Sequence, residues 1–227
     1  MAGNSLALII GAGPGVSASL ARLLHMNGYD IALAARNTDK LIGLAEETHA
    51  AAYPCDVTNR DSIASLFDTV GATPDVMIYN PSYRVRGPLV DLDPDEVQRT
   101  IQTTAFGAFL AAQQAARRML ERGSGTIIFT GASAGVKGYP QSAPFAMGKF
   151  ALRGLAQSMA RELHPQNIHI GHVVIDGGIR SERRPDEPGA DKLLDPDAIA
   201  ESYLHLIRQP RSSWSWEIEI RPWVEKF

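Results

Sequence analysis

The stretch that decides the fold is residues 6–24, which read LALIIGAGPGVSASLARLL. An apolar run suited to a buried strand stops at the first of three closely spaced glycines, and a helical pattern follows. Glycine lets the backbone turn tightly and approach a ligand, and the free N–H groups at a helix start attract phosphate. This pattern predicts a nucleotide diphosphate site, although the strict dinucleotide fingerprint has glycine where Val16 stands, and the alternative is a simple tight turn. The predicted contacts are Gly11, Gly13, Pro14, Gly15 and Val16.

Seven short apolar runs alternate with longer helical patterns along the chain. Most of these runs show no polar alternation, which is typical of strands buried on both faces of a parallel sheet. The helical stretches between them are long enough for right-handed crossovers. We therefore predict a doubly wound parallel α/β sheet of about seven strands with helices on both faces. The predicted strands are Leu6–Ile10, Asp30–Ala34, Ala51–Cys55, Asp75–Tyr79, Thr126–Thr130, His169–Ile175 and Trp214–Ile220.

The composition is that of a compact domain. The 227 residues are 44% apolar, enough for one well-buried core, so we expect a single domain over residues 1–227. A formal charge of −3 gives no electrostatic footprint for nucleic acid or an anionic membrane. The single cysteine, Cys55, cannot form an intrachain disulfide, and the first ten residues carry no signal-peptide pattern, so a cytoplasmic location is expected. The six histidines show no metal-ligand spacing, and no metal site is predicted.

Two long helices are predicted over Pro94–Arg122 and Gln141–His164. The first carries a stripe of mostly small side chains at three- and four-residue spacing. Small side chains permit close helix approach, either onto the sheet of the same subunit or onto a second subunit. Packing on the sheet is the simpler interpretation. The stripe consists of Ile101, Ala105, Ala108, Ala112, Ala115 and Met119.

The end of the second strand predicts the cofactor preference. About 20 residues past the glycine loop, a protein that selects NAD places an acidic residue on the ribose hydroxyls. Here the chain has Ala35 and Arg36. Because a planar guanidinium suits a 2′-phosphate, the expected cofactor is NADP in preference to NAD. The alternative is a solvated arginine at a strand end.

With these features in place, the chain resembles the short-chain dehydrogenase/reductase family over essentially its whole length, a family with a Rossmann-type fold. Residues 10–17 resemble its glycine loop, with Ser17 at the last glycine. Residues 55–57 resemble its adenine contact, residues 79–82 its Asn-Asn-Ala-Gly segment, and residues 176–181 the segment that holds the nicotinamide carboxamide, with Asp176 in place of proline. The cofactor contacts implied by the resemblance are Asp56, Val57, Asn80, Lys149, Gly177, Ile179 and Ser181.

The resemblance also locates the catalytic set, which in this family is Asn, Ser, Tyr and Lys. The Tyr-x-x-x-Lys segment reads FAMGK here, so Lys149 matches and Phe145 takes the tyrosine position. The serine position falls on Ala132, or on Ser133 after a one-residue adjustment, and the asparagine position is Thr104. A spacing of four puts Phe145 and Lys149 on one helical face, so Lys149 can still hold the nicotinamide ribose although Phe145 cannot transfer a proton.

The missing phenol matters because a general acid typically contributes on the order of 10²–10⁴ in rate. Substitute proton donors are Ser142, Tyr139, Ser133 and Tyr83, each of which has an ordinary structural alternative. An iminium substrate would accept hydride without a proton in the same step.

The polar stretch Arg180–Leu194 matches a mobile substrate lid in the resembled family, and its Arg183 and Arg184 could meet an acidic substrate or be merely solvated. The resemblance implies an NADP-dependent oxidoreductase acting on a small carbonyl, alcohol or imine, and a homodimer or homotetramer paired through the two long helices. The alternative function is a non-catalytic NADP-binding sensor or scaffold.

Overall fold

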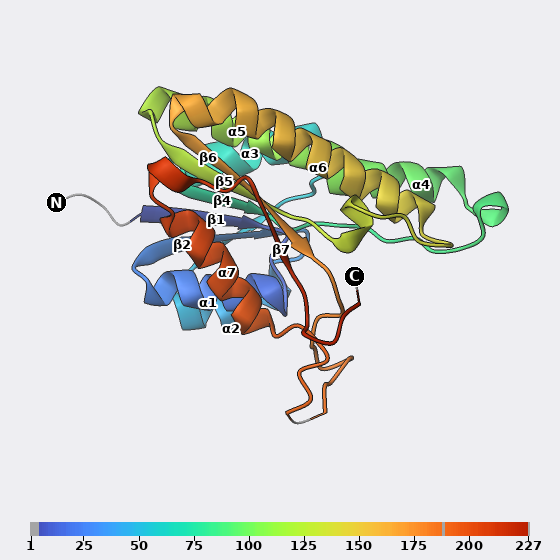
Figure 1. The fold of residues 1–227 in the computed structure, drawn as a ribbon. Coiled ribbons are helices and arrows are strands. Elements are labelled where there is room, and N and C mark those ends of the chain that lie inside the picture. The colour runs from blue at the N-terminus through green and yellow to red at the C-terminus, as the bar shows by residue number, and fades with distance from the viewer. Residues whose placement is uncertain (1–4, 188, 227) are drawn as a thin grey trace.

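A seven-stranded parallel sheet forms the centre of the molecule (Figure 1). The computed structural model describes residues 5–187 and 189–226. The strand order is β3-β2-β1-β4-β5-β6-β7, the doubly wound arrangement predicted from the sequence. All seven predicted strands are present, with ends that differ by up to three residues. Their bounds are β1 Ser5–Ile10, β2 Tyr29–Ala35, β3 Ala51–Pro54, β4 Val76–Tyr79, β5 Gly125–Thr130, β6 Ile168–Ile175 and β7 Glu217–Ile220.

Helices cover both faces of the sheet (Figure 1). The helices α1, α2 and α7 lie on one face, and α3, α5 and α6 on the other, with α4 beyond the sheet and in contact with α6. Each face buries its own apolar cluster, which is why the strands are apolar on both sides. The helix bounds are α1 Val16–Met26, α2 Ile42–Thr48, α3 Arg60–Val70, α4 Pro94–Ile101, α5 Gly107–Arg122, α6 Ala143–Leu163 and α7 Pro196–Arg208.

The helical run predicted over Pro94–Arg122 is interrupted. Residues Gln102–Phe106 form a π-helical turn between α4 and α5. The Tyr79 hydroxyl donates a 2.5 Å hydrogen bond to the Thr103 carbonyl in this turn. The other predicted helix begins at Ala143 instead of Gln141, because Gln141 has a left-handed backbone (φ 58°) that cannot continue a helix.

The alanine stripe of α5 lies inside the subunit. Ala108, Ala112 and Ala115 are buried in the apolar cluster beneath α5 and α6. Their use as a close-approach surface between subunits was therefore wrong, because the sheet of the same chain already covers them. Packing on the sheet was the correct interpretation.

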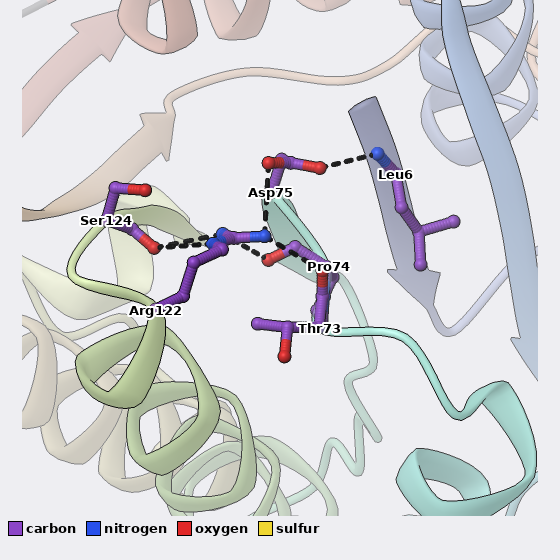
Figure 2. A network of polar contacts seen from close by, with 6 residues as sticks. All are labelled: Leu6, Thr73, Pro74, Asp75, Arg122 and Ser124. Carbon is purple, nitrogen blue, oxygen red and sulfur yellow. Dashed lines mark hydrogen bonds and ion pairs between the residues drawn. The ribbon is translucent and has the colours of Figure 1, made fainter. Parts of the chain in front are cut away.

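A polar network fixes the end of the sheet opposite the glycine loop (Figure 2). The Asp75 carboxylate accepts a 2.7 Å hydrogen bond from the Leu6 N–H and pairs with Arg122 at 3.1 Å. Arg122 also donates to the carbonyls of Thr73, Pro74 and Ser124. The end of α5 is thereby tied to the starts of β4 and β5. The opposite ends of these strands are left to form a ligand site.

In the described residues, no helix combines the length and apolar character that a membrane crossing requires.

Candidate active site

A cavity of about 870 Å³ opens where the carboxyl ends of β1, β4, β5 and β6 meet. This is the position at which open α/β sheets bind ligands, because strand order reverses there. The sequence predicted a site here from several separate segments, and the structure brings most of them to one cavity. The predicted residues lining the cavity are Pro14, Gly15, Val16, Asn80, Ser133, Phe145, Lys149, Gly177, Ile179 and Ser181.

The glycine loop has the shape of a phosphate cradle. Gly11 and Gly15 have φ of +81° and +85°, which side chains other than glycine rarely adopt. A Cβ at Gly11 would stand 2.7 Å from Pro81, whereas a Cβ at Gly13 or Gly15 would meet nothing within 4 Å. The open space beside this backbone and the start of α1 fits a diphosphate group.

Ser17 connects the loop to the cavity. Its hydroxyl donates to the Gly11 carbonyl at 3.1 Å and accepts from the Asn80 amide at 2.7 Å. A glycine at this position could make neither bond. Ser17 therefore fixes the orientation of Asn80 on the cavity wall, a positioning role that the sequence analysis missed.

Lys149 lies at the bottom of the cavity on α6. Its side chain is 2% exposed, and its Nζ donates a 2.7 Å hydrogen bond to the Thr130 carbonyl at the end of β5. Burial lowers the pKa of Lys149 to about 8, because desolvation penalises the ammonium form. Its Nζ is 5.7 Å from the centre of the Phe145 ring, so the two side chains share one helical face as predicted.

The remaining catalytic candidates do not all reach the cavity. Ala132 and Ser133 both line it, so the structure keeps both positions for the family serine open. Thr104 is fully buried in the π turn, where its Oγ1 accepts a 3.4 Å hydrogen bond from the Tyr83 N–H. An added Cβ at Gly148 would stand 3.0 Å from the Thr104 side chain, so Thr104 packs under α6 instead of lining the cavity.

The substitute proton donors separate in the same way. Ser142 and Tyr139 line the cavity. The Ser142 hydroxyl is buried and has no hydrogen-bond partner within the described chain. Tyr83 turns away, since its hydroxyl donates to Glu96 at 2.5 Å and its ring lies under the Arg99 guanidinium. Tyr83 is therefore held by α4 and is poorly placed to serve the cavity.

A second cavity, of about 600 Å³, lies beyond the ends of β2 and β3 and includes Arg36 and Asp56. The Oδ1 atom of Asp56 accepts hydrogen bonds from the Thr58 N–H and hydroxyl, which lower the pKa of Asp56. The positive charge of Arg36 also lowers the pKa of Asp56. These positions fit the predicted adenine and 2′-phosphate contacts. Val57, in contrast, is buried in the apolar core, and its side chain does not line either cavity.

The predicted lid leaves the sheet after β6 and is closed at its base. The Arg180 N–H donates to the Leu194 carbonyl at 2.9 Å, and the Leu194 N–H donates to the Gly178 carbonyl at 2.8 Å. The Arg180 side chain pairs with Asp195 at 2.6 Å. These contacts hold Gly177, Ile179 and Ser181 beside the cavity.

Asp176 is a further wall residue that the sequence analysis treated only as a departure from proline. It is buried and pairs with Lys137 at 3.2 Å and with Arg221 at 3.5 Å. Arg84 and Arg86, which were not predicted from the sequence, line the cavity from the segment after β4. The signal that could have found them is the alternation of polar and apolar residues from Ser82 to Arg86.

Comparisons with known proteins agree on the family. The sequence model of the family described as short chain dehydrogenase matches residues 5–187. An uncharacterised oxidoreductase of Staphylococcus aureus (strain N315) is 29% identical over 229 residues, covering 96% of this chain and 97% of the relative. The chain belongs to the short-chain dehydrogenase/reductase family of NAD(P)-dependent oxidoreductases.

Two solved structures are similar over nearly their full length. A short-chain dehydrogenase from Rhodopseudomonas palustris has a TM-score of 0.84 and 32% identity, covering 96% of this chain and 99% of that one. A metagenomic short-chain oxidoreductase in complex with NADP has a TM-score of 0.84 and 26% identity, covering 96% of this chain and 97% of that one. The Rossmann-type fold that the resemblance implied is thereby confirmed.

Proposed function

We propose that this protein is an NADP-dependent oxidoreductase that moves hydride between nicotinamide and a small carbonyl, alcohol or imine substrate. The observation that carries the proposal is the 870 Å³ cavity, which joins the glycine loop, Asn80, Lys149 and the Gly177–Ser181 segment at the switch point of the sheet. The NADP complex of the metagenomic relative supports the cofactor class. A bound nicotinamide would supply the hydride.

In this proposal each segment that lines the two cavities has a separate task. The glycine loop and the start of α1 bind the diphosphate, and Arg36 binds the 2′-phosphate. Asp56 accepts from the adenine amine. Asn80, held by Ser17, and Lys149 position the nicotinamide half, with Lys149 bonding the ribose hydroxyls. Gly177, Ile179 and Ser181 hold the carboxamide.

Phe145 cannot donate a proton to the substrate, so another group must perform this step. Three hydroxyls on the cavity wall, those of Ser133, Tyr139 and Ser142, are candidates to donate to a substrate oxygen. The Lys149 ammonium is a fourth, because its pKa of about 8 makes it a better acid than an ordinary lysine. An iminium substrate would need none of them, since its nitrogen loses its charge on accepting hydride.

A second candidate function is a non-catalytic NADP-binding protein, favoured by the lack of an acidic hydrogen on Phe145. Titration of NADPH followed by its fluorescence tests binding, and NADPH consumption over a panel of carbonyls and cyclic imines tests turnover. The oxidoreductase proposal expects both. Binding without turnover on every class would favour the sensor or scaffold, and no binding would refute both.

The variant Phe145→Tyr tests how much of the reductase site is intact. We expect it to gain or increase carbonyl reduction, because the phenol would stand one helical turn before Lys149. No gain, with NADPH binding retained, would mean that Ala132 and Thr104 also leave the site incomplete for carbonyls. Imine turnover by the wild type would then be the measurement that distinguishes the oxidoreductase from the non-catalytic protein.

We also infer a homodimer or homotetramer. Its contact surface is the outer face of the π turn, α5 and α6, where Phe106, Phe109, Met147 and Phe150 are exposed. A cytoplasmic location remains a prediction from the single, buried cysteine.

A further inference from the structure

A row of alternating side chains faces the cavity after β4. Ser82, Arg84 and Arg86 are exposed and line the cavity, whereas Tyr83 and Val85 are half-buried and turn away. This alternation is what an extended segment produces when one side meets a packed surface. The row is attached on both sides of the arginines, by the Tyr83 N–H to Thr104 and by a 3.1 Å hydrogen bond from the Gly87 N–H to the Gln141 carbonyl.

Arg84 lies over the residue at the family's tyrosine position. Its Cζ is 5.1 Å from the centre of the Phe145 ring, within the range of a cation–π contact. A guanidinium in this contact uses its flat face, which leaves its N–H groups to donate in the plane. A phenol at this position is not needed for that contact. The arrangement therefore presents positive charge beside the substrate end of the cavity.

A third arginine approaches from the lid. Arg184 belongs to a tight turn in which the N–H groups of Ser181 and Arg184 each donate to the other's carbonyl at 3.0 Å. The Arg184 Nη1 lies 2.7 Å from the place that a Cβ on Gly178 would occupy, so the absence of a side chain at Gly178 makes room for it. Arg84 and Arg184 thus come from different walls of one cavity.

The charges on the cavity wall are unbalanced. Six basic residues and two acidic residues line it, although the whole chain has a formal charge of −3. Asp176 is occupied by Lys137 and Arg221, and Arg180 by Asp195. Three other arginines on the wall are Arg84, Arg86 and Arg184. Within residues 5–187 and 189–226, no ion pair joins any of these three to a carboxylate, so they remain available for substrate.

The cofactor does not account for these arginines. Its diphosphate belongs with the glycine loop, where Arg180 and Arg183 line a further cavity together with Pro14 and Gly15. Arg84, Arg86 and Arg184 do not line that cavity. Its 2′-phosphate belongs with Arg36, in the other cavity. Arg84 and Arg86 lie with Ser142 and Phe145 on the wall formed by the segment after β4 and the start of α6.

We propose that the substrate carries an oxyanion, a carboxylate or a phosphate, that is bound by Arg84 and Arg86 with Arg184 closing over it. The Ser142 hydroxyl, buried on the same wall without a partner, is a further donor for a substrate oxygen. This inference rests on the proposed function, because it names the substrate class of that same cavity.

The test uses pairs of compounds that differ in one charge. Pyruvate is compared with pyruvamide, and dihydroxyacetone phosphate with dihydroxyacetone, for binding to the full-length protein with and without NADPH by calorimetry. The rate of NADPH oxidation is recorded separately. The variants are the double substitution Arg84→Gln with Arg86→Gln, and Arg117→Gln on the exposed surface of α5 as a control that removes one charge outside the cavity.

We expect the wild type to bind at least one charged compound about tenfold or more tightly than its neutral partner, as charge-assisted hydrogen bonds to arginine do. The double variant should reduce that preference to about twofold or less, with the NADPH dissociation constant and thermal midpoint unchanged, and Arg117→Gln should keep it. The stronger of the two pairs identifies the anion as carboxylate or phosphate.

Three outcomes would overturn the inference. They are equal binding of charged and neutral partners, a preference that survives the double substitution, and a loss of NADPH affinity in the double variant that matches the loss of preference. The outcome for the proposed function is separate. A wild type that binds the anion through these arginines but neither binds nor oxidises NADPH would refute the oxidoreductase and leave the anion site standing.

Discussion

In the proposed function the preference for NADP depends on one exposed side chain, Arg36, which follows β2 and shares a cavity with Asp56. The substitution Arg36→Ala should weaken NADPH binding by about tenfold or more, because it removes a charge-assisted contact worth roughly 1.5–3 kcal/mol. NADH has no 2′-phosphate, so its affinity should stay within about twofold. Fluorescence titration of both cofactors measures this. Equal weakening of the two, or the same loss in the control Arg60→Ala on α3, would contradict the assignment.

In the protein without cofactor, Lys149 should lower the free energy of unfolding. Its pKa falls from 10.5 to about 8 on burial, which corresponds to about 3 kcal/mol against the charged folded state at neutral pH. Replacing it by methionine removes the buried charge but keeps a side chain of similar length. Lys149→Met should therefore raise the thermal midpoint while abolishing NADPH binding.

The pH dependence follows from the sign of this shift. Between pH 8 and 10.5 the unfolded wild type binds the Lys149 proton and the folded protein does not, so wild-type stability rises with pH. The advantage of Lys149→Met should be largest below pH 8 and shrink above it. Calorimetric scans from pH 6 to 10 measure the difference, with Lys137→Met as the partly exposed control. A methionine variant less stable than wild type at pH 7 would show that the Thr130 contact outweighs desolvation.

At this scale the sequence predicted residues whose roles depend on local spacing. Phe145 and Lys149 face the same cavity because four residues separate them on one helix. The roles of Thr104 and Tyr83 were harder to predict, because they depend on contacts with α6 and with Glu96. The partners of Asp176 come from distant segments, and no local pattern indicates them.

Among the elements, the junction of the π turn with α5 leaves no room for a side chain at Gly107. An added Cβ at Gly107 would stand 2.5 Å from the Val57 carbonyl oxygen and 2.6 Å from the Tyr79 hydroxyl. Gly154, inside α6, would meet nothing within 4 Å. Gly107→Ala should lower the free energy of unfolding by about 1–3 kcal/mol through overpacking. Gly154→Ala should raise it by about 0.5–1 kcal/mol, because alanine loses less backbone entropy in a helix.

Urea denaturation of the wild type and the two variants measures these changes in the free energy of unfolding. Both variants carry the same chemical change, from glycine to alanine. If both substitutions shift the midpoint in the same direction, the close approach at Gly107 is not what limits the site. Because the Tyr79 hydroxyl also holds Thr103, a destabilised Gly107→Ala variant should show a disturbed tyrosine signal in near-ultraviolet circular dichroism.

The strands and long helices could be predicted because apolar periodicity is local. The π turn could not, since the apolar spacing runs through it unbroken and the Tyr79 hydroxyl that bonds its Thr103 carbonyl comes from a distant strand. The alanine stripe could be located on the helix, but periodicity does not say whether the buried face meets the same chain or another.

For the whole molecule, assembly is expected through apolar side chains that the subunit leaves uncovered. Phe109 on α5 is 40% exposed, and Phe150 on α6 is 45% exposed. Light scattering should give a mass of two or four times 24.6 kDa at micromolar concentration. Phe109→Glu should shift the mass toward 24.6 kDa with an unchanged circular dichroism spectrum, because a charge would be buried at each symmetry-related contact.

A substitution on the buried face of α5 should have a different effect from one on its exposed face. Ala112→Arg should unfold the subunit instead of separating subunits, since Ala112 lies in the core. A wild-type mass near 24.6 kDa would refute the assembly, and a soluble, folded Ala112→Arg monomer would contradict the burial of the stripe.

The strand order also affects the growing chain on the ribosome. β1, β2 and β3 are made first and can pair with one another, but β1 receives its second neighbour only when β4 has left the exit tunnel. During that interval a strand with no polar residue from Ala7 to Ile10 has an open hydrogen-bonding edge. Synthesis slowed before Tyr79 would prolong the exposure of that edge. A chaperone that covers apolar strand edges should therefore bind the nascent chain during this interval.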